Sequence, residues 1–433
     1  MSGITRRQFL GKLAVLGGVG LGVAGGLAGR RWWEGEILSA SPPAPPQPPT
    51  PWSTEALYYT SVVQEGTLNC SACHGEADPP LPVTYCHTPH AGIYVRCNLC
   101  PHRCFIPEGQ RGRCRVRENR GGRLFSMVYG NPCAVHVDPI EKKPFYHFLP
   151  AAATFSLATA GCNLRCLYCQ NWEISQVPPE ETKNYDLPPE RIVYHALDLG
   201  APVIAYTYTE PIVFYEYMLE TARQAREAGL KNVVISAGFI NPEPLRALCA
   251  AVDAIKIDLK GYDEDFYRKI CQAELRPVLE AIRVIHESGI HLEIVNLVVP
   301  TLNDRIDQLR ALARWLAREV SPDVPLHFTR FSPAYKLTNL PPTPVETLER
   351  AREVALEEGM RFVYVGNVWG HSGSHTYCPR CGEAVILREG FAVRAYHIRK
   401  GACAYCGEPI PGVWWPEGTS ISPTGTSGET SDQ

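Results

Sequence analysis

The stretch Gly161–Glu173 reads GCNLRCLYCQNWE and follows an apolar run typical of a β-strand. Cys162, Cys166 and Cys169 are spaced so that three thiolates can close on one small inorganic cluster. Iron–sulfur clusters normally take four cysteine ligands, so three thiolates around a four-iron cluster leave one iron open to a substrate. The alternatives are a structural zinc knuckle and a fully ligated electron-transfer cluster that takes a distant fourth cysteine.

Short apolar or β-branched runs alternate with helical stretches from about Ala153 onward. The runs are TFSLATA, PVIAYTYTE, NVVISAGFI, AIKIDLK, HLEIVNLVVP, PLHFTRFSP and RFVYVGNV. This alternation predicts a parallel sheet buried on both faces. Residues 211–230, with Gly229 as C-cap, and 304–320 have the apolar spacing of outer helices. We therefore predict an α/β fold with a full or partial (β/α) barrel over 151–370, flanked by small metal-bound cysteine-rich modules.

Polar residues stand at the ends of several predicted strands, where a barrel carries its chemistry. They are Glu210, Ser236, Asp258, Lys260 and Asn296. Two of these positions have simpler explanations. Glu210 precedes Pro211, so it could be a first-turn acid that stabilises a helix dipole. Asp258 and Lys260 lie on one face of a strand and could form a surface ion pair.

The three-cysteine loop resembles the signature of the radical S-adenosylmethionine (SAM) superfamily, with Tyr168 in the aromatic position. The resemblance implies a [4Fe–4S] cluster on Cys162, Cys166 and Cys169, whose open iron binds the amino and carboxylate groups of SAM. One electron from the reduced cluster would then cleave SAM to a 5′-deoxyadenosyl radical that abstracts hydrogen from a substrate. In this family the protein supplies positioning and water exclusion, while the cofactor supplies the radical.

The same resemblance assigns the strand-end residues to SAM binding. Thr209-Glu210-Pro211 stands where activating enzymes have Gly-Gly-Glu-Pro, and Asp258-Leu259-Lys260 matches their Asp-x-Lys run. Ser236 begins a run similar to Thr-Asn-Gly-Phe, and Asn296 is a further candidate of the same kind. The chain departs from the family pattern in two places: Tyr208 and Thr209 replace the glycines, and the Asn is absent after Ser236.

A wider resemblance covers the chain from Glu55 to Trp415. The runs CNLCPHRC, VDPIEKKPFYHFLP, CQNWEIS, RFSPAYKL, YVGNV, CPRCG and CAYCGEPIPGVW are similar to those of the radical SAM enzyme of the AmmeMemoRadiSam system, which is related to pyruvate formate-lyase-activating enzymes. This resemblance implies SAM and a one-electron donor as partners. Its substrate is either a partner protein, as for activating enzymes that generate a glycyl radical, or a small molecule.

Two pairs of cysteines near the C-terminus predict a zinc-ribbon-like module over 371–415. Each pair is a CxxCG knuckle, and the AVILREGFAVRAYHI run between them predicts a hairpin around Glu389 and Gly390. Four soft ligands make the closed tetrahedral set of structural zinc, formed here by Cys378, Cys381, Cys403 and Cys406. A rubredoxin-type iron fits the same ligands, and a disulfide pair fits an oxidising compartment.

A second four-cysteine set predicts a metal-bound module before the barrel, over 55–150. It consists of Cys97, Cys100, Cys104 and Cys114, with His102 as a substitute ligand. Spacing alone does not separate zinc from an auxiliary iron–sulfur cluster, and either structure or electron relay fits. Residues 96–123 also carry eight arginines. We expect them to offset anionic thiolates and not to bind nucleic acid, because stacking aromatics are not interleaved with them.

Cys70-Ser-Ala-Cys73-His74 has the form of a c-type haem attachment motif. It lies in a stretch, about 69–95, that is extra relative to the family pattern. Cys86, His87 and His90 would then serve as axial ligands or belong to a third metal site. The alternative is that Cys70, Cys73 and His74 hold another metal or none.

The N-terminal residues 1–40 read as a twin-arginine signal. Arg6 and Arg7 precede an apolar run, and Leu38-Ser39-Ala40 fits a cleavage site, although an uncleaved anchor fits equally. We expect export or tethering to a membrane, with a cytoplasmic location as the alternative because SAM and strong reductants are cytoplasmic. Residues 41–54 are a stiff proline-rich linker, and 416–433 form a tail of disordered composition.

Composition agrees with this division into parts. The chain has 433 residues, 45% of them hydrophobic, which leaves room for one barrel core and two small metal-stapled modules. Its 17 cysteines lie mostly in CxxC-type groups, which favours metal binding over disulfide bonds. The net charge of −3 does not favour binding to nucleic acid. We predict a radical SAM enzyme; the alternative is a non-catalytic carrier with several iron–sulfur or haem centres.

Overall fold

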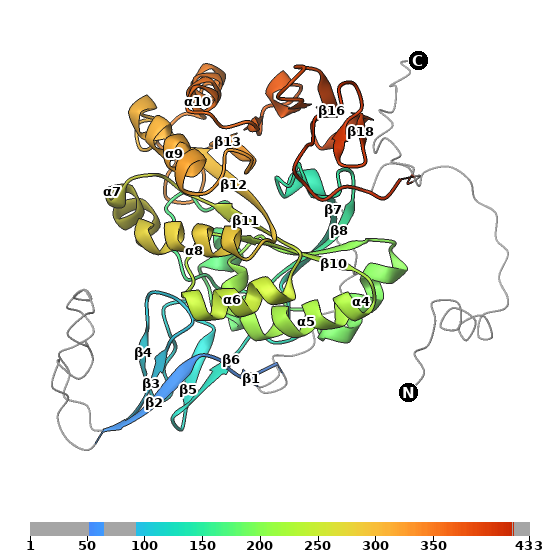
Figure 1. Ribbon diagram of the computed structural model, residues 1–433. Coiled ribbons are helices and arrows are strands. Elements are labelled where there is room, and N and C mark those ends of the chain that lie inside the picture. The colour runs from blue at the N-terminus through green and yellow to red at the C-terminus, as the bar shows by residue number, and fades with distance from the viewer. Residues whose placement is uncertain (1–51, 65–91, 418, 420–433) are drawn as a thin grey trace, which may run out of the picture. The chain divides into compact units, whose positions relative to one another are not determined.

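The computed structural model describes residues 52–64, 92–417 and 419 (Figure 1). Several predictions concern residues outside these ranges: the signal, most of the linker, most of the tail, and the haem motif with its neighbours. Cys70, Cys73, His74, Cys86, His87 and His90 all lie there. Within the described ranges no helix combines the length and the hydropathy needed to cross a bilayer.

An eight-stranded sheet carries the fold, in the order β14-β13-β12-β11-β10-β9-β8-β7. Strands β8 to β14 are parallel neighbours, and β7 is antiparallel to β8. The strands are β7 (Ala134–Pro139), β8 (Ala153–Ala158), β9 (Val203–Tyr206), β10 (Lys231–Ser236), β11 (Ala254–Asp258), β12 (His291–Val298), β13 (Leu326–Arg330) and β14 (Val363–Gly366). Within the described residues β14 pairs with β13 alone, so the barrel is partial. All seven predicted strands are confirmed, and β7 joins them from the segment assigned to the N-terminal module.

Helices connect successive parallel strands (Figure 1). They are α4 (Pro189–Asp198), α5 (Tyr215–Glu227), α6 (Pro242–Ala251), α7 (Glu264–Phe266), α8 (Leu275–Glu287), α9 (Ile306–Glu319) and α10 (Val345–Glu357). Short turns complete the connections: η2 (Ile140–Lys142), α3 (Trp172–Ser175), η3 (Pro179–Glu181), η4 (Pro211–Phe214), the π-helix η5 (Tyr267–Cys271) and η6 (Ser372–Ser374). The two predicted helices are confirmed as η4 with α5 and as α9. Gly229 follows the end of α5 at φ 79°, the left-handed conformation of a helix C-terminus.

Apolar side chains close the amino-terminal end of the sheet. Phe145 and Phe148, from the VDPIEKKPFYHFLP run, are fully buried against Val203, Val233 and Ala254 of the parallel strands. Glu293, near the start of β12, accepts the backbone N–H groups of the adjoining Tyr146 and His147 at 2.9 and 2.8 Å. Because this end is filled, the opposite, carboxyl end is left for chemistry.

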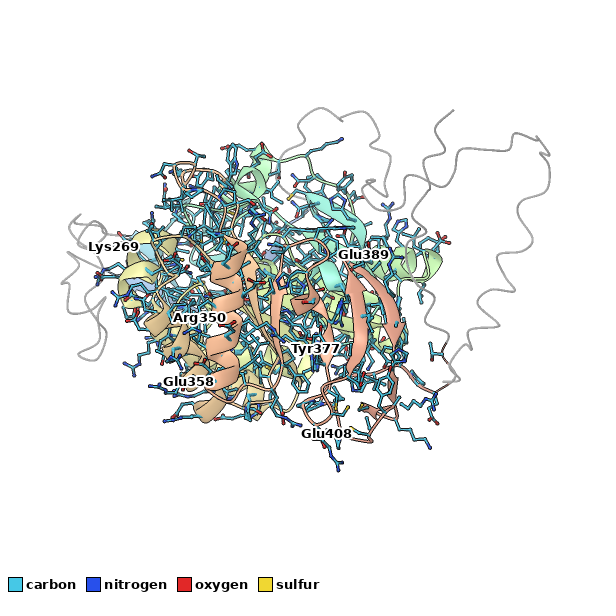
Figure 2. The ribbon with its side chains drawn as sticks, turned by 90° about the horizontal axis from the view of Figure 1, so that it is seen from above. Lys269, Arg350, Glu358, Tyr377, Glu389 and Glu408 are labelled. Atoms are coloured by element: carbon cyan, nitrogen blue, oxygen red, sulfur yellow. The ribbon has the colours of Figure 1, made fainter. Side chains whose placement is uncertain are left out.

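Small sheets lie in sequence before and after the large one. Before it are the sheets β1-β6-β5 and β2-β3-β4, with β1 (Thr54–Glu55), β2 (Tyr59–Gln64), β3 (Gly92–Cys97), β4 (Phe105–Pro107), β5 (Arg117–Arg120) and β6 (Arg123–Ser126). After it are β15 (Thr376–Tyr377), β16 (Ala384–Glu389), β17 (Ala392–Tyr396), β18 (Ile398–Arg399) and β19 (Ala402–Cys403). The predicted hairpin is confirmed, since Glu389 of β16 pairs with Ala392 of β17. Figure 2 labels Glu389 on it and Tyr377 and Glu408 nearby in this C-terminal part.

Candidate active site and cysteine centres

The three-cysteine loop follows β8 and therefore lies at the carboxyl end of the sheet. Backbone bonds fix it: the N–H groups of Arg165 and Leu167 donate to the carbonyls of Cys271 and Ile270, each at 3.0 Å. The N–H of Lys336, from the loop after β13, donates to the carbonyl of Leu167 at 2.9 Å. The cluster loop is thus held from two other strand ends.

Cys162, Cys166 and Cys169 are all free thiols. The N–H of Leu164 donates to Cys162 Sγ at 3.3 Å, and Ser175 Oγ lies 3.3 Å from Cys169 Sγ. Burial raises the pKa of the Cys162 thiol, and negative charge on Glu210 and Cys166 raises it further. Three thiols in one short loop, two of them beside N–H or O–H donors, fit an iron–sulfur cluster.

Cys271 is a neighbour of this loop that sequence analysis missed. It is fully buried at the end of η5, within hydrogen-bonding range of Cys166, and its sulfur lies 3.6 Å from the hydroxyl of Tyr168. The hydrogen bond with Cys271, together with burial, raises the pKa of the Cys166 thiol well above its usual value. Cys271 stands alone in the run KICQAE, so no spacing marks it, and only the packing of η5 on the loop brings it here.

Glu210 and Ser236 come together from the ends of β9 and β10. The buried carboxylate of Glu210 accepts the hydroxyl of Ser236 at 2.6 Å and the N–H of Ala237 at 2.8 Å. It also accepts the N–H of Ile212 at 3.3 Å and so caps η4, with Pro211 at the first position. The strand-end and the helix-cap interpretations of Glu210 therefore both describe contacts that it makes. Burial raises its pKa, which those donors partly offset.

Asp258 and Lys260 form an ion pair at the end of β11, with Lys260 Nζ 3.0 Å from the carboxylate. A second lysine that the sequence analysis overlooked, Lys256, binds the other oxygen of Asp258 and is only 4% exposed. The surface-pair alternative therefore does not describe this partly buried triad. Burial alone would raise the pKa of Asp258, but the two lysine charges lower it to about 2. The sequence did carry a signal for Lys256: in AIKIDLK it alternates with Asp258 and Lys260, and residues two apart in a strand lie on the same face.

Asn296 offers an unused acceptor at the end of β12. Its Nδ2 donates to the carbonyl of Leu259 at 2.8 Å, and it is fully buried. Its Oδ1 has no partner within the described residues, as is also true of Asn163 Oδ1 in the cluster loop. Buried polar atoms are normally hydrogen-bonded, so these two oxygens fit a polar ligand such as SAM.

Tyr208 replaces a glycine of the Gly-Gly-Glu-Pro pattern and keeps a glycine-like backbone conformation. Its φ is 62°, a left-handed conformation that glycine adopts easily and tyrosine rarely. The carbonyl of Tyr208 accepts Asn171 Nδ2 at 2.6 Å, and its hydroxyl donates to Asp138 of β7 and accepts from Lys143 Nζ at 3.1 Å. These contacts hold the backbone of this strand end in the conformation that glycine would otherwise provide.

The C-terminal cysteines form a compact tetrad. The ligand atoms of Cys378, Cys381, Cys403 and Cys406 all lie within 4.8 Å of one another, and no other group of three or more His, Cys, Asp or Glu in the described ranges is this compact. Both knuckles fold alike: the N–H groups of Gly382 and Gly407, each at φ 76°, donate to the carbonyls of Cys378 and Cys403 at 2.9 Å. Burial alone would raise the pKa of Cys378, but backbone amides of Cys381 and Arg380 lower it to about 7. The tetrad can therefore hold a metal or a cluster.

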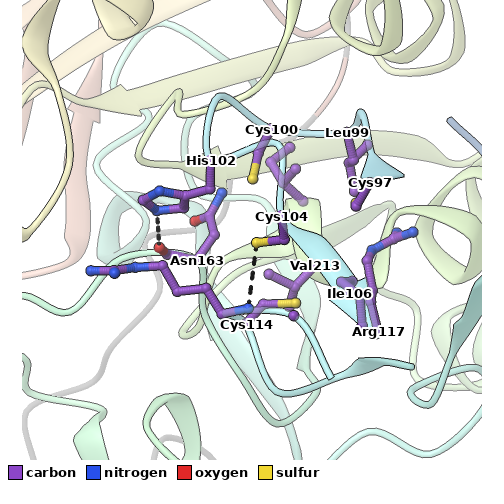
Figure 3. Close-up of a pocket in the computed structure, with 13 residues that line it drawn as sticks. Cys97, Leu99, Cys100, His102, Cys104, Ile106, Cys114, Arg117, Asn163 and Val213 are labelled. Atoms are coloured by element: carbon purple, nitrogen blue, oxygen red, sulfur yellow. Dashed lines mark hydrogen bonds between the residues drawn. The ribbon is translucent and has the colours of Figure 1, made fainter. Parts of the chain in front are cut away.

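The N-terminal cysteines line one cavity (Figure 3). Cys97, Cys100, Cys104 and Cys114 are free, and their sulfur atoms are not part of a compact group. His102 lines the same cavity, and its Nε2 donates to the carbonyl of Asn163 at 2.8 Å, so that nitrogen is already used. Burial lowers the pKa of His102 to about 4.

Sequence comparison identifies a matching family and several related proteins. The model of the radical SAM superfamily matches residues 156–316, from β8 into α9. The uncharacterized protein MJ0808 of Methanocaldococcus jannaschii is 50% identical over 318 residues, covering 73% of this chain and 95% of that protein. Pyruvate formate-lyase 1-activating enzyme of Escherichia coli K12 is 22% identical over 220 residues, covering 47% and 89%.

Among solved structures, a domain of the pyruvate-formate lyase-activating enzyme from Bacteroides vulgatus matches 38% of this chain and 98% of its own, with 16% identity and a TM-score of 0.34. The family assignment therefore rests on the sequence relatives and not on the solved structure. The chain belongs to the radical SAM superfamily and is a radical SAM enzyme related to the pyruvate formate-lyase-activating enzymes.

Proposed function

We propose that Cys162, Cys166 and Cys169 hold the [4Fe–4S] cluster of this enzyme and that it acts on a partner protein, as activating enzymes do. The observation that carries the proposal is the position of the three-cysteine loop, at the carboxyl end of the sheet, where the strand ends also carry Glu210, Lys260 and Asn296. When bound, the cluster and SAM supply an organic radical that abstracts hydrogen from the substrate. We include the finer assignment to the AmmeMemoRadiSam group, which rests on the runs CNLCPHRC, VDPIEKKPFYHFLP and RFSPAYKL.

The residues of the chain would bind and orient SAM. Lys260 carries a positive charge suited to the carboxylate of SAM, and Asp258 with Lys256 holds that lysine in place. The free Oδ1 of Asn296 suits an N–H donor. Glu210 and Ser236 bring the ends of β9 and β10 together beside the loop. Phe145 and Phe148 exclude water from the opposite end of the strands.

An aromatic pair next to the cluster loop supports a macromolecular substrate. Trp172, directly after the loop, is 40% exposed and stacks on Tyr335 of the loop after β13, with ring centroids 5.3 Å apart. Exposed tryptophan and tyrosine are common anchors of protein interfaces. A small-molecule substrate would have less use for an aromatic surface outside the buried strand ends.

We also propose that the C-terminal tetrad holds structural zinc, because four thiols at this spacing match a closed tetrahedral site. Export or membrane tethering through residues 1–40 remains a prediction for residues that the structure leaves undescribed.

The test is anaerobic reconstitution with iron and sulfide, reduction with dithionite, and chromatography for 5′-deoxyadenosine after SAM is added. We expect the product from the natural chain and from Cys249→Ala, a buried cysteine of α6, but not from Cys166→Ala. Absence of the product despite a full cluster would contradict the proposal and favour the non-catalytic electron carrier. The substrate class is then tested with deuterated candidate partner proteins. Deuterium that appears in 5′-deoxyadenosine identifies the protein from which hydrogen is abstracted.

A further inference from the structure

The two sets of four cysteines differ in how far apart their sulfur atoms lie. In a tetrahedral zinc site with Zn–S bonds of about 2.3 Å, the sulfur atoms are about 3.8 Å apart. The C-terminal tetrad meets this expectation: Cys378 and Cys406 are 3.6 Å apart, and Cys381 and Cys403 are 3.8 Å apart. The N-terminal cysteines do not form such a group, although all four line one cavity.

The N-terminal thiols nevertheless converge. Cys97, Cys100, Cys104 and Cys114 all line the same cavity, so the four side chains surround one space. The cavity that they surround also has apolar walls, formed by Leu99, Ile106, Ile212 and Val213. The N–H of Arg113 donates to Cys104 Sγ at 3.5 Å, a contact typical of thiolates that bind metal clusters.

A buried cation lines the same cavity. Arg117 is only 2% exposed, and its guanidinium binds Glu216 at 2.7 and 3.1 Å. Its Nε has no hydrogen-bond partner among the described residues. Arg117 lines the cavity together with Cys97 and Cys114. The charge of Arg117 is paired with Glu216, but its unused Nε–H donor fits a further acceptor in the cavity, because buried polar atoms are normally hydrogen-bonded.

The cavity directly adjoins the three-cysteine loop. A Cβ on Gly161 would lie 2.6 Å from the carbonyl oxygen of Cys114, so only glycine allows the two cysteine segments to touch here. Asn163, between Cys162 and Cys166, lines the cavity, and Arg165 donates to the carbonyl of Arg113 at 3.1 Å. The three cysteines of the loop likewise do not form a group whose sulfur atoms all lie within 4.8 Å of one another.

We propose that Cys97, Cys100, Cys104 and Cys114 bind a second iron–sulfur cluster, and not zinc. In a cluster the thiolates bind different iron atoms and are held farther apart than around one ion. Wide sulfur spacing around a shared cavity, N–H donation to sulfur and the buried Arg117 all fit that arrangement. The site is independent of the substrate and of SAM cleavage, so it stands even if the proposed function fails.

The full-length chain is reconstituted anaerobically as a triple variant, Cys162→Ala, Cys166→Ala and Cys169→Ala, which removes the first set of ligands. We expect this variant to retain iron and acid-labile sulfide in equal amounts, an iron–sulfur EPR signal after dithionite reduction, and one zinc per chain from the C-terminal tetrad. Adding Cys100→Ser and Cys104→Ser should abolish the iron, the sulfide and the EPR signal, whereas adding Cys249→Ser should not.

Two results would overturn the proposal: a folded triple variant with no sulfide and two zinc ions per chain, or one with no metal beyond the C-terminal ion. Circular dichroism of the triple variant verifies its folding. Because the triple variant keeps all four N-terminal cysteines, its metal content decides the question even if the quintuple variant does not fold.

Discussion

The two ends of the parallel sheet differ in composition: the amino end packs aromatic rings beside the hydrogen-bonded Glu293, whereas polar side chains gather at the carboxyl end. At the amino end, Phe145 and Phe148 are completely buried and pack on three strands. At the carboxyl end, Lys256, Asp258 and Asn296 are held in partly or fully buried positions, and Asn296 Oδ1 is left unpaired. Apolar packing at one end supplies stability, so the other can carry polar groups whose burial costs free energy. Substitutions at the two ends should therefore have different consequences.

The largest effect is expected from Cys166→Ala at the carboxyl end. Loss of one of the three proposed ligands should abolish 5′-deoxyadenosine formation, while the metal of the C-terminal tetrad, which we propose to be zinc, is retained. Product chromatography and metal analysis measure the two quantities. Parallel loss of zinc would show that the cysteine sites are not independent modules.

At the amino end, Phe148→Ala should lower the free energy of unfolding by about 3 to 5 kcal/mol, because a fully buried aromatic ring is replaced by a cavity. The spectrum of the reconstituted cluster should not change. Chemical denaturation measures the effect, with Phe391→Ala, at an exposed phenylalanine, as the control. A loss below 1 kcal/mol would mean that this end does not carry the stability assigned to it.

The antiparallel strand β7 links the two ends through Asp138, which binds Lys142 and Lys143 at 2.8 and 2.6 Å. Burial alone would raise the pKa of Asp138, but the lysine charges lower it to about 2 from 3.8. A lowered pKa contributes stability above pH 3.8 that is lost as the pH falls to about 2.

We expect Asp138→Asn to lose about 2 kcal/mol at pH 7 and to show a weaker dependence of stability on pH between 5 and 2. Denaturation at several pH values measures this, with the exposed Asp186→Asn as the control. If Asp138→Asn lost as much stability between pH 5 and 2 as the natural chain does, the ion pair would not stabilise the fold.

The smallest effect on the isolated enzyme is expected from Trp172→Ala. The side chain is partly exposed but stacks on Tyr335, so stability should fall by about 0.5 to 1.5 kcal/mol, and SAM cleavage without a partner should be retained. Hydrogen transfer from a protein substrate should fall, and Trp369→Ala, at a more exposed tryptophan, serves as the control. Equal transfer by both variants would argue against an aromatic docking surface beside the loop.

Local spacing was sufficient for the features whose geometry is set within a few residues. The alternation of TFSLATA, PVIAYTYTE and the later runs predicts the seven parallel strands, because burial on both faces demands continuous apolar residues. The CxxCG repeats predict the compact tetrad, since each knuckle closes through one glycine with positive φ. Three cysteines in one short loop likewise mark the proposed cluster ligands before any fold is known.

Long-range packing decided the rest. The pairing of β7 with β8 leaves the barrel partial, and no local pattern shows which strands form its edges. Cys271 reaches Cys166 from η5, more than a hundred residues later in the chain. Tyr208 keeps a glycine-like φ because Asn171 holds it from one segment and Asp138 with Lys143 from another. The different sulfur spacings of the two four-cysteine sets also appear only in three dimensions, because similar spacing in sequence is compatible with either one ion or a cluster.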